Sequence, residues 1–172
     1  MAIHTRTRLR ASDAADIEQL VRETRFFSAE EVAIARELAD DGVANGPGSH
    51  YRFIVAEEDG VLLGYTCFGP VPCTQSSWDL YWIAVRPGAQ GKNLGRELLE
   101  ISERAVRAAG GTRLYAETSS RDQYLPTRAF YERRGYAVEA RMPGFYGPGD
   151  DKVVFGKVVG NEAPTVSGGG GK

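Results

Sequence analysis

The loop RPGAQGKNLG, residues 86–95, combines glycines with positive charge between an apolar run, LYWIAV, and a helical stretch, RELLEISERAVRAA. The N–H groups in the first turn of a helix have no intrahelical partner, and the helix dipole adds positive potential there. Small residues let an anion approach this backbone, and Lys92 and Arg96 add charge beside it. The loop therefore predicts an anion site, although a turn without a ligand would explain the same glycines.

Two well-known nucleotide loops do not fit this stretch. A P-loop requires a glycine five residues before Gly91, where Arg86 stands, and Ser or Thr at the position of Asn93. The dinucleotide fingerprint G-x-G-x-x-G does not match Gly91 and Gly95, which are four residues apart. The spacing excludes both loops and leaves the identity of the anion open.

Two carboxylates stand on strands expected on either side of the following helix. Asp79 opens the apolar strand DLYWIAV and, by strand alternation, is expected to share a face with Tyr81, Ile83 and Val85. Glu117, in LYAETS, is the alternative. A carboxylate in such a place can act as a general base. Equally, Asp79 can end a strand at a solvent edge and Glu117 can belong to a polar face.

The hydrophobic periodicity predicts an order of strand, two helices, three strands, helix, strand, helix and two strands. Ser28 and Glu31 form a capping-box pattern for the second helix, which we expect to end near Gly42. Asp59-Gly60 predicts a tight hairpin, and PGFYGPGDD, residues 143–151, is expected to be the loop between the last two strands. This order predicts an α+β protein with helices packed on a mixed sheet.

The length of 172 residues suits one domain, which we assign to residues 1–159, followed by a disordered glycine-rich tail at 160–172. A formal net charge of -2 argues against nucleic acid or an anionic membrane as a partner. No apolar stretch is long enough to span a bilayer, and no signal-peptide core is recognisable. Cys67 and Cys73 favour free thiols over a disulfide or a metal site, so we expect a cytoplasmic protein without a metal.

The stretch IAVRPGAQGKNLGRELL resembles the acetyl-CoA-binding motif of GNAT-superfamily acetyltransferases, in which [Gln/Arg]-x-x-Gly-x-[Gly/Ala] joins a strand to a helix. Gln90 matches its first position and Gly95 its last, whereas Asn93 stands where glycine is usual. RAFYERRGY resembles the second marker of the family. The resemblance covers residues 4–159 and implies the GNAT fold, with a mixed, mostly antiparallel sheet of six to seven strands and helices on both faces.

The resemblance implies acetyl-CoA as cosubstrate and assigns residues to it. The backbone of the preceding strand would pair with the pantetheine, and the loop would hold the pyrophosphate, with Asn93 tolerating a left-handed backbone. Arg96 adds charge, and Thr127 offers a hydroxyl from the later helix. The implied cofactor residues are Ile83, Ala84, Val85, Gln90, Gly91, Lys92, Asn93, Leu94, Gly95, Arg96 and Thr127.

The resemblance also implies direct attack of a primary amine on the thioester. Tyr131 matches the tyrosine that the family often uses as general acid, although packing on the sheet would also explain it. Asp79, Glu117 or a water relay remains open as the general base. Cys67 and Cys73 have no obvious base beside them, so a covalent cysteine intermediate is not expected.

The acceptor is expected to be a small-molecule amine or a peptide. Phe145 and Tyr146, with Asp150 and Asp151, would suit a small cationic amine or belong to an ordinary hairpin connection. The alternatives are a non-catalytic acyl-CoA-binding or sensor module, and a transferase for a longer acyl-CoA. The exposed final strands of this fold also imply a homodimer as one form of assembly.

Overall fold

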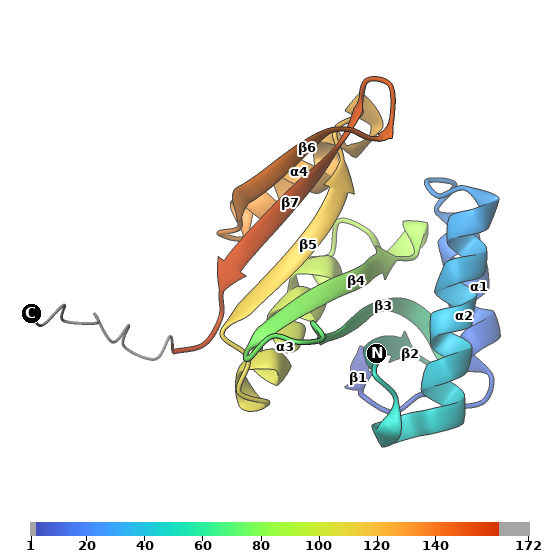
Figure 1. Ribbon diagram of the computed structural model, residues 1–172. Coiled ribbons are helices and arrows are strands. Elements are labelled where there is room, and N and C mark those ends of the chain that lie inside the picture. The colour runs from blue at the N-terminus through green and yellow to red at the C-terminus, as the bar shows by residue number, and fades with distance from the viewer. Residues whose placement is uncertain (1–2, 162–172) are drawn as a thin grey trace, which may run out of the picture.

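A seven-stranded sheet forms the centre of the protein in the computed structural model, which describes residues 3–161 (Figure 1). The strands lie in the order β1-β2-β3-β4-β5-β7-β6. Within the described residues, β4 and β5 form the one parallel pair, and all other neighbours are antiparallel. The strands are His4–Arg6 (β1), Arg52–Glu58 (β2), Val61–Pro70 (β3), Ser77–Val85 (β4), Arg113–Ser119 (β5), Ala137–Gly147 (β6) and Asp150–Val158 (β7). The expected mixed, mostly antiparallel sheet is confirmed.

Four α-helices cover the two faces of this sheet, as expected (Figure 1). One apolar cluster joins α1 and α2 to the sheet and includes Ile17 and Leu20. A second cluster on the opposite face joins α3 and α4 to the sheet and includes Leu98 and Phe155. The helices are Asp13–Glu23 (α1), Ala29–Asn45 (α2), Leu94–Ala108 (α3) and Leu125–Arg133 (α4). The predicted order of elements is therefore confirmed.

Several local signals act as the sequence indicates. Ser28 and Glu31 form a complete capping box at the start of α2. Asp59 and Gly60 both have positive φ angles, 51° and 79°, and join β2 to β3 in a tight hairpin. Gly42, however, does not end α2, which continues to Asn45. A Cβ atom at this glycine would come within 2.5 Å of the Phe53 ring, so its small size lets α2 pack against β2.

The segment expected to be a loop at 143–151 is mostly strand. β6 continues through Phe145 and Tyr146 to Gly147, with a register shift after Met142, and the turn is only Pro148 and Gly149. Strand alternation was masked in the sequence by two glycines and a proline. The predicted disordered tail, residues 160–172, lies outside the described residues from 162 onward. No helix within the described part is long and apolar enough to cross a membrane.

β4 and β5 separate halfway along their length. They pair only from Ser77–Leu80 against Arg113–Ala116. Beyond this point β4 stays with β3 as far as Val85, while β5 stays with β7 as far as Ser119. The two strands diverge in Figure 1. Among the described residues, no strand pairs with the β5-facing edge of residues 81–85, so backbone groups are available there.

A β-bulge in β4 occurs at the same place. Trp82 pairs with Cys67 and Leu80 pairs with Phe68, which leaves Tyr81 as the extra residue. Leu80 and Ile83 consequently pack into the same cluster beneath α3 and α4, whereas Tyr81 packs toward α1 and α2. The expectation that Asp79 shares a face with Ile83 and Val85 is therefore wrong. Of the three residues expected to share a face with Asp79, only Tyr81 does so, because the bulge interrupts the alternation before Ile83.

Close packing fixes α3 against the end of β4. Leu94 and Leu98 are buried, and Gly64 of β3 lies directly beneath the helix. A Cβ atom at Gly64 would lie 3.0 Å from Cδ1 of Leu98 and 3.1 Å from the Ala84 carbonyl oxygen. A glycine here lets the first turn of α3 lie beside the unpaired edge of β4.

Candidate functional site

A cavity of about 440 Å³ lies between the end of β4, the loop before α3, and α4. The sequence-predicted cofactor residues line it together, except Lys92, which is exposed outside the lining. The lining residues are Ile83, Ala84, Val85, Ala89, Gln90, Gly91, Asn93, Leu94, Gly95, Arg96, Pro126, Thr127, Phe130, Arg133 and Arg134. The structure thus brings the glycine loop and Thr127 to one cavity, although 32 positions separate Gly95 from Thr127.

The backbone of the loop has the conformation that an anion site requires. Gly91 has a φ of 79°, and Asn93 adopts the left-handed conformation with φ 62° and ψ 5°. This confirms that asparagine tolerates that backbone here. Asn93 is the N-cap of α3, but its side chain makes no capping hydrogen bond. The side chain therefore leaves the first-turn N–H groups of α3 available to a ligand.

The residues present fit coenzyme A. The unpaired edge of β4 offers backbone groups to amides, and the left-handed loop offers N–H groups to a pyrophosphate. A Cβ atom at Gly95 would meet Val85 and Phe130 only at 3.7 and 3.8 Å, so packing within the protein does not demand glycine there. A glycine at this position also leaves the backbone open to close approach by a ligand. The Gln90 side-chain amide donates to the Val85 carbonyl at 3.1 Å and ties the loop to the strand.

Tyr131 lies in the apolar cluster beneath α4 and is 5% exposed. Its ring contacts those of Phe155 and Tyr136, each with a centroid separation of 5.5 Å. Tyr131 is not among the residues that line the cavity, whereas Phe130 is. Burial raises the pKa of the Tyr131 phenol, so the group stays protonated in neutral solution. Tyr131 thus makes the ring contacts expected if its role is packing on the sheet, which was the alternative to catalysis in the sequence analysis.

Asp79 and Glu117 flank the point where β4 and β5 separate. Asp79 is half-buried, and burial followed by the nearby charge of Glu117 raises its carboxyl pKa, while Lys152 and His50 oppose this rise. Glu117 is about half exposed, and its carboxylate accepts an ion pair from Nζ of Lys152 at 2.7 Å. Of the two carboxylates, Asp79 thus has the drier surroundings.

His50 is a neighbour of this pair that sequence reasoning missed. Its Nε2 atom lies 3.1 Å from the Tyr81 hydroxyl oxygen, and its ring packs edge-on against Tyr51. Burial and the charge of Asp79 raise the pKa of Tyr81 to about 12. His50 comes from the segment before β2, far from β4 in sequence, so no spacing signal links the two. The β4 bulge brings Tyr81 to it.

A row of aromatic rings lies on the α1 and α2 side of β4. The Phe26 ring lies 4.7 Å from the ring of Tyr124, and Phe27 lies 4.9 Å from Trp82. Phe26 and Phe27 also contact each other edge-on, at 5.1 Å. Tyr124 thus packs against Phe26 from the far side of the site. Phe27 and Trp82 thus belong to the apolar cluster on the face opposite α3 and α4.

The acidic residues near the β6–β7 turn are already paired. Asp150 forms an ion pair with Arg121 at 3.1 Å, and Asp151 forms one with Arg141 at 2.7 Å. The Gly144 N–H donates to Asp151 as well, and together these bonds lower the pKa of that carboxyl. The two aspartates therefore hold the turn together and are poorly placed to attract a cationic amine. Within residues 3–161, no group of three or more metal-ligating side chains comes together.

Comparison with known proteins agrees with this geometry. A sequence model described as "Acetyltransferase (GNAT) family" matches residues 15–136. The crystal structure of a GNAT-family protein from Desulfovibrio desulfuricans is 43% identical, with a TM-score of 0.90, covering 92% of this chain and 99% of that one. The Salmonella typhimurium protein yncA, solved with its cofactor acetyl-CoA, has a TM-score of 0.73 over 95% of this chain and 97% of its own. At 22% identity, that likeness concerns the fold alone.

Curated relatives match over shorter stretches. An IAA acetyltransferase from Azospirillum brasilense is 36% identical over 99 residues, which are 56% of this chain and 61% of that protein. A mycothiol acetyltransferase from Streptomyces avermitilis is 34% identical over 88 residues, 50% of this chain and 27% of that protein. The chain thus spans less than two thirds of either relative. With the family model covering most of the chain, and with the sheet, helices and loop arranged as described, this protein belongs to the acetyltransferase (GNAT) family.

Proposed function

We propose that the protein is an N-acetyltransferase that transfers an acetyl group from acetyl-CoA directly to a primary amine. The observation that carries this proposal is the separation of β4 and β5, which has an anion-binding loop on one side and two carboxylates on the other. Bound acetyl-CoA supplies an activated acetyl group. A new C–N bond forms, the C–S bond breaks, and the protein handles one proton at each end.

The cavity residues hold the cosubstrate. The β5-facing edge of residues 81–85 takes the place of a strand partner for the pantetheine amides. The loop residues Gly91 to Gly95 surround the pyrophosphate, where the left-handed Asn93 and the first turn of α3 present N–H groups. Thr127 and Phe130 form the opposite wall from α4. The small side chain of Ala84, on the β4 side of the cavity, leaves room for the acyl group. The β4 side therefore also tolerates a longer acyl chain.

Asp79 acts as the general base. The neutral amine attacks the thioester, and its nitrogen loses one proton as the amide forms. A half-buried carboxylate with a raised pKa accepts this proton more readily than an exposed carboxylate. Glu117 contributes negative charge beside it, which raises the pKa of Asp79. The amine approaches from the α1 and α2 side, past the aromatic rings of Phe27 and Trp82.

Tyr131 acts as the general acid. Its raised pKa keeps the phenol protonated at the pH where Asp79 is ionised, so each group is in the form that its role requires. The ring is held between Phe155 and Tyr136, which limits its rotation. Once the leaving sulfur comes within its reach, a fixed donor replaces the slower encounter with a proton from water. The acceptor itself is a small-molecule amine or the amine of a peptide.

The test is a thiol-release assay with acetyl-CoA and a panel of arylalkylamines, amino acids, polyamines, aminoglycosides and peptides. We expect release of free coenzyme A that depends on one class of acceptor, with mass spectrometry showing one added acetyl group on the amine. Reactions without acceptor provide the hydrolysis control. Tight binding of acetyl-CoA with no acceptor-dependent release would instead identify a non-catalytic acyl-CoA-binding module.

A further inference from the structure

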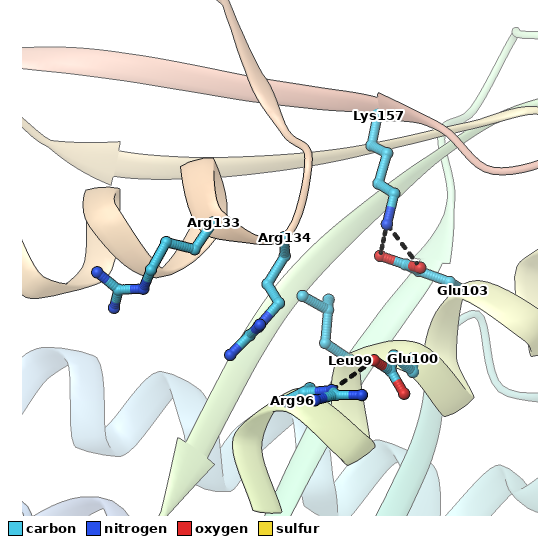
Figure 2. Close-up of a pocket in the computed structure, with 7 residues that line it drawn as sticks. All are labelled: Arg96, Leu99, Glu100, Glu103, Arg133, Arg134 and Lys157. Atoms are coloured by element: carbon cyan, nitrogen blue, oxygen red, sulfur yellow. Dashed lines mark hydrogen bonds and ion pairs between the residues drawn. The ribbon is translucent and has the colours of Figure 1, made fainter. Parts of the chain in front are cut away.

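A second cavity, of about 290 Å³, continues from the first between α3 and α4 (Figure 2). The two cavities share three lining residues, Arg96, Arg133 and Arg134. Beyond these arginines the second cavity extends along α3 past Glu100 and Glu103. A single elongated ligand that fills the first cavity can therefore extend into the second without leaving the protein surface.

The charges in this second cavity do not cancel. Nε of Arg96 bonds Oε1 of Glu100 at 2.8 Å, and Nζ of Lys157 bonds the Glu103 carboxylate at 2.9 Å. Both carboxylates are thus matched by a cation of their own. Arg133 and Arg134 form no ion pair with any carboxylate among residues 3–161. Two positive charges remain, on the side where the two cavities join.

Arg134 has an unusual environment for an arginine. Its Nε atom is buried and has no hydrogen-bond partner within the described chain, and its guanidinium lies 5.6 Å from the centre of the Phe130 ring. In Figure 2 its side chain extends from the end of α4 toward Arg96 on α3, while Arg133 points away along the surface. A buried donor without an acceptor is costly, and folded proteins rarely keep one unless a ligand or water completes it.

We propose that Arg134, assisted by Arg133, binds the ribose 3′-phosphate of coenzyme A, so that the protein distinguishes coenzyme A from its 3′-dephospho form. This inference rests on the proposed cofactor. With the pyrophosphate at the first turn of α3, the second cavity lies one turn further, about 5 Å along the helix axis. A phosphate monoester is a compact dianion, and a guanidinium group offers it a planar pair of donors.

The test measures dissociation constants by calorimetry for acetyl-CoA and for acetyl-3′-dephospho-CoA, without an acceptor. The intact protein should bind acetyl-CoA about 10- to 100-fold more tightly than the dephospho form, as expected for a charge-assisted contact. Arg134→Gln should weaken acetyl-CoA binding to nearly the level of the dephospho form and leave the dephospho form unchanged. Arg104→Gln is the matched control, because Arg104 is an exposed arginine of α3 outside both cavities.

Arg133→Gln provides a second variant, because Arg133 is exposed and its loss does not endanger folding. It should reduce the preference for acetyl-CoA about 3- to 10-fold, the smaller effect of an exposed cation. Equal binding of the two cofactor forms by the intact protein would overturn the inference while leaving the proposed acetyl transfer intact. If neither form binds, the proposed function fails as well. A preference that survives in both arginine variants would also overturn it.

Discussion

Nε2 of His50 lies 3.1 Å from the hydroxyl oxygen of Tyr81, and both residues are close enough to Asp79 for their charges to affect one another. This contact joins the segment before β2 to the bulge of β4. Because His50 lowers the pKa of Asp79 and burial raises it, the pKa of the proposed base depends on both. The contact therefore influences the pH range in which Asp79 is ionised.

His50→Gln should move the acid side of the pH profile of kcat/KM to higher pH. His50 opposes the rise in the pKa of Asp79, so its removal lets that pKa rise further, and more alkaline solution is needed to ionise the carboxyl. Glutamine keeps a hydrogen-bonding group beside Tyr81. A profile measured from pH 5 to pH 9 checks the shift. Movement toward lower pH would show that His50 acts in another way.

Asp79→Asn should lower kcat/KM about 10²- to 10⁴-fold, the usual contribution of general base catalysis. Glu117→Gln is the comparison, because it has the same change of charge at the more exposed carboxylate, and we expect a smaller loss. The ratio of the two variants identifies the base. Equal losses would indicate that the pair acts only through its negative charge.

Asp79→Asn should also make the protein more stable at pH 7. The carboxyl pKa in the folded state lies above its ordinary value of 3.8, so the folded state holds the proton more tightly than the unfolded chain. Stability then falls as pH rises from the ordinary pKa through the raised one. Asparagine removes that loss. Thermal unfolding should show a higher Tm for the variant at pH 7 and a much smaller difference at pH 3.5.

Tyr131→Phe should leave the affinity for coenzyme A nearly unchanged and lower kcat about 10²- to 10⁴-fold. Phenylalanine keeps the ring contacts with Phe155 and Tyr136, so the cavity and the fold stay intact. Calorimetric titration with coenzyme A and a thiol-release assay separate the two effects. An unchanged kcat would remove Tyr131 from the reaction and leave it a packing residue.

Asn93→Gly should tighten coenzyme A binding or leave it unchanged. Glycine adopts a φ of 62° without strain, and the Asn93 side chain makes no capping hydrogen bond that would be lost. The substitution also opens space beside the pyrophosphate loop. Binding is measured by calorimetry. A loss of tenfold or more would mean that the asparagine side chain itself holds the cofactor.

Gly64→Ala should destabilise the protein by about 1–3 kcal/mol, the usual cost of overpacking. The added methyl group would crowd Cδ1 of Leu98 and the Ala84 carbonyl, and so push α3 away from β4. Gly88→Ala is the control, because nothing lies within 4 Å of a Cβ atom there. Urea unfolding of both variants checks this. A destabilisation of the same size at Gly88 would contradict the packing argument.

The order of elements could be read from the sequence because each signal is local. The capping box at Ser28 and the hairpin at Asp59 depend on residues within a few positions of each other. The glycine loop likewise joins a strand to the helix beside it, which let the cavity wall from Ile83 to Arg96 be anticipated. Tertiary packing explains the exception at Gly42. This glycine lies inside α2 rather than at its end, and a larger residue there would clash with the Phe53 ring.

The part of the site around Asp79 and Tyr81 could not be predicted from local signals. The bulge at Tyr81 arises from the pairing of β4 with β3, and strand alternation gives no warning of it. For this reason the prediction that Asp79 shares a face with Ile83 is wrong. The contact of His50 with Tyr81 and the aromatic contact of Phe27 with Trp82 join residues far apart in the chain. No spacing in a single sequence predicts such contacts.

The extra residue in β4 makes that strand a partition between two compartments. Before the bulge, Asp79 points away from the cofactor cavity, and after it Ile83 and Val85 lie along that cavity. Under the proposed function, the same strand thus borders both the donor cavity and the acceptor side. Under the proposed function, a substitution at Tyr81 would therefore alter the acceptor side without removing a residue that lines the donor cavity.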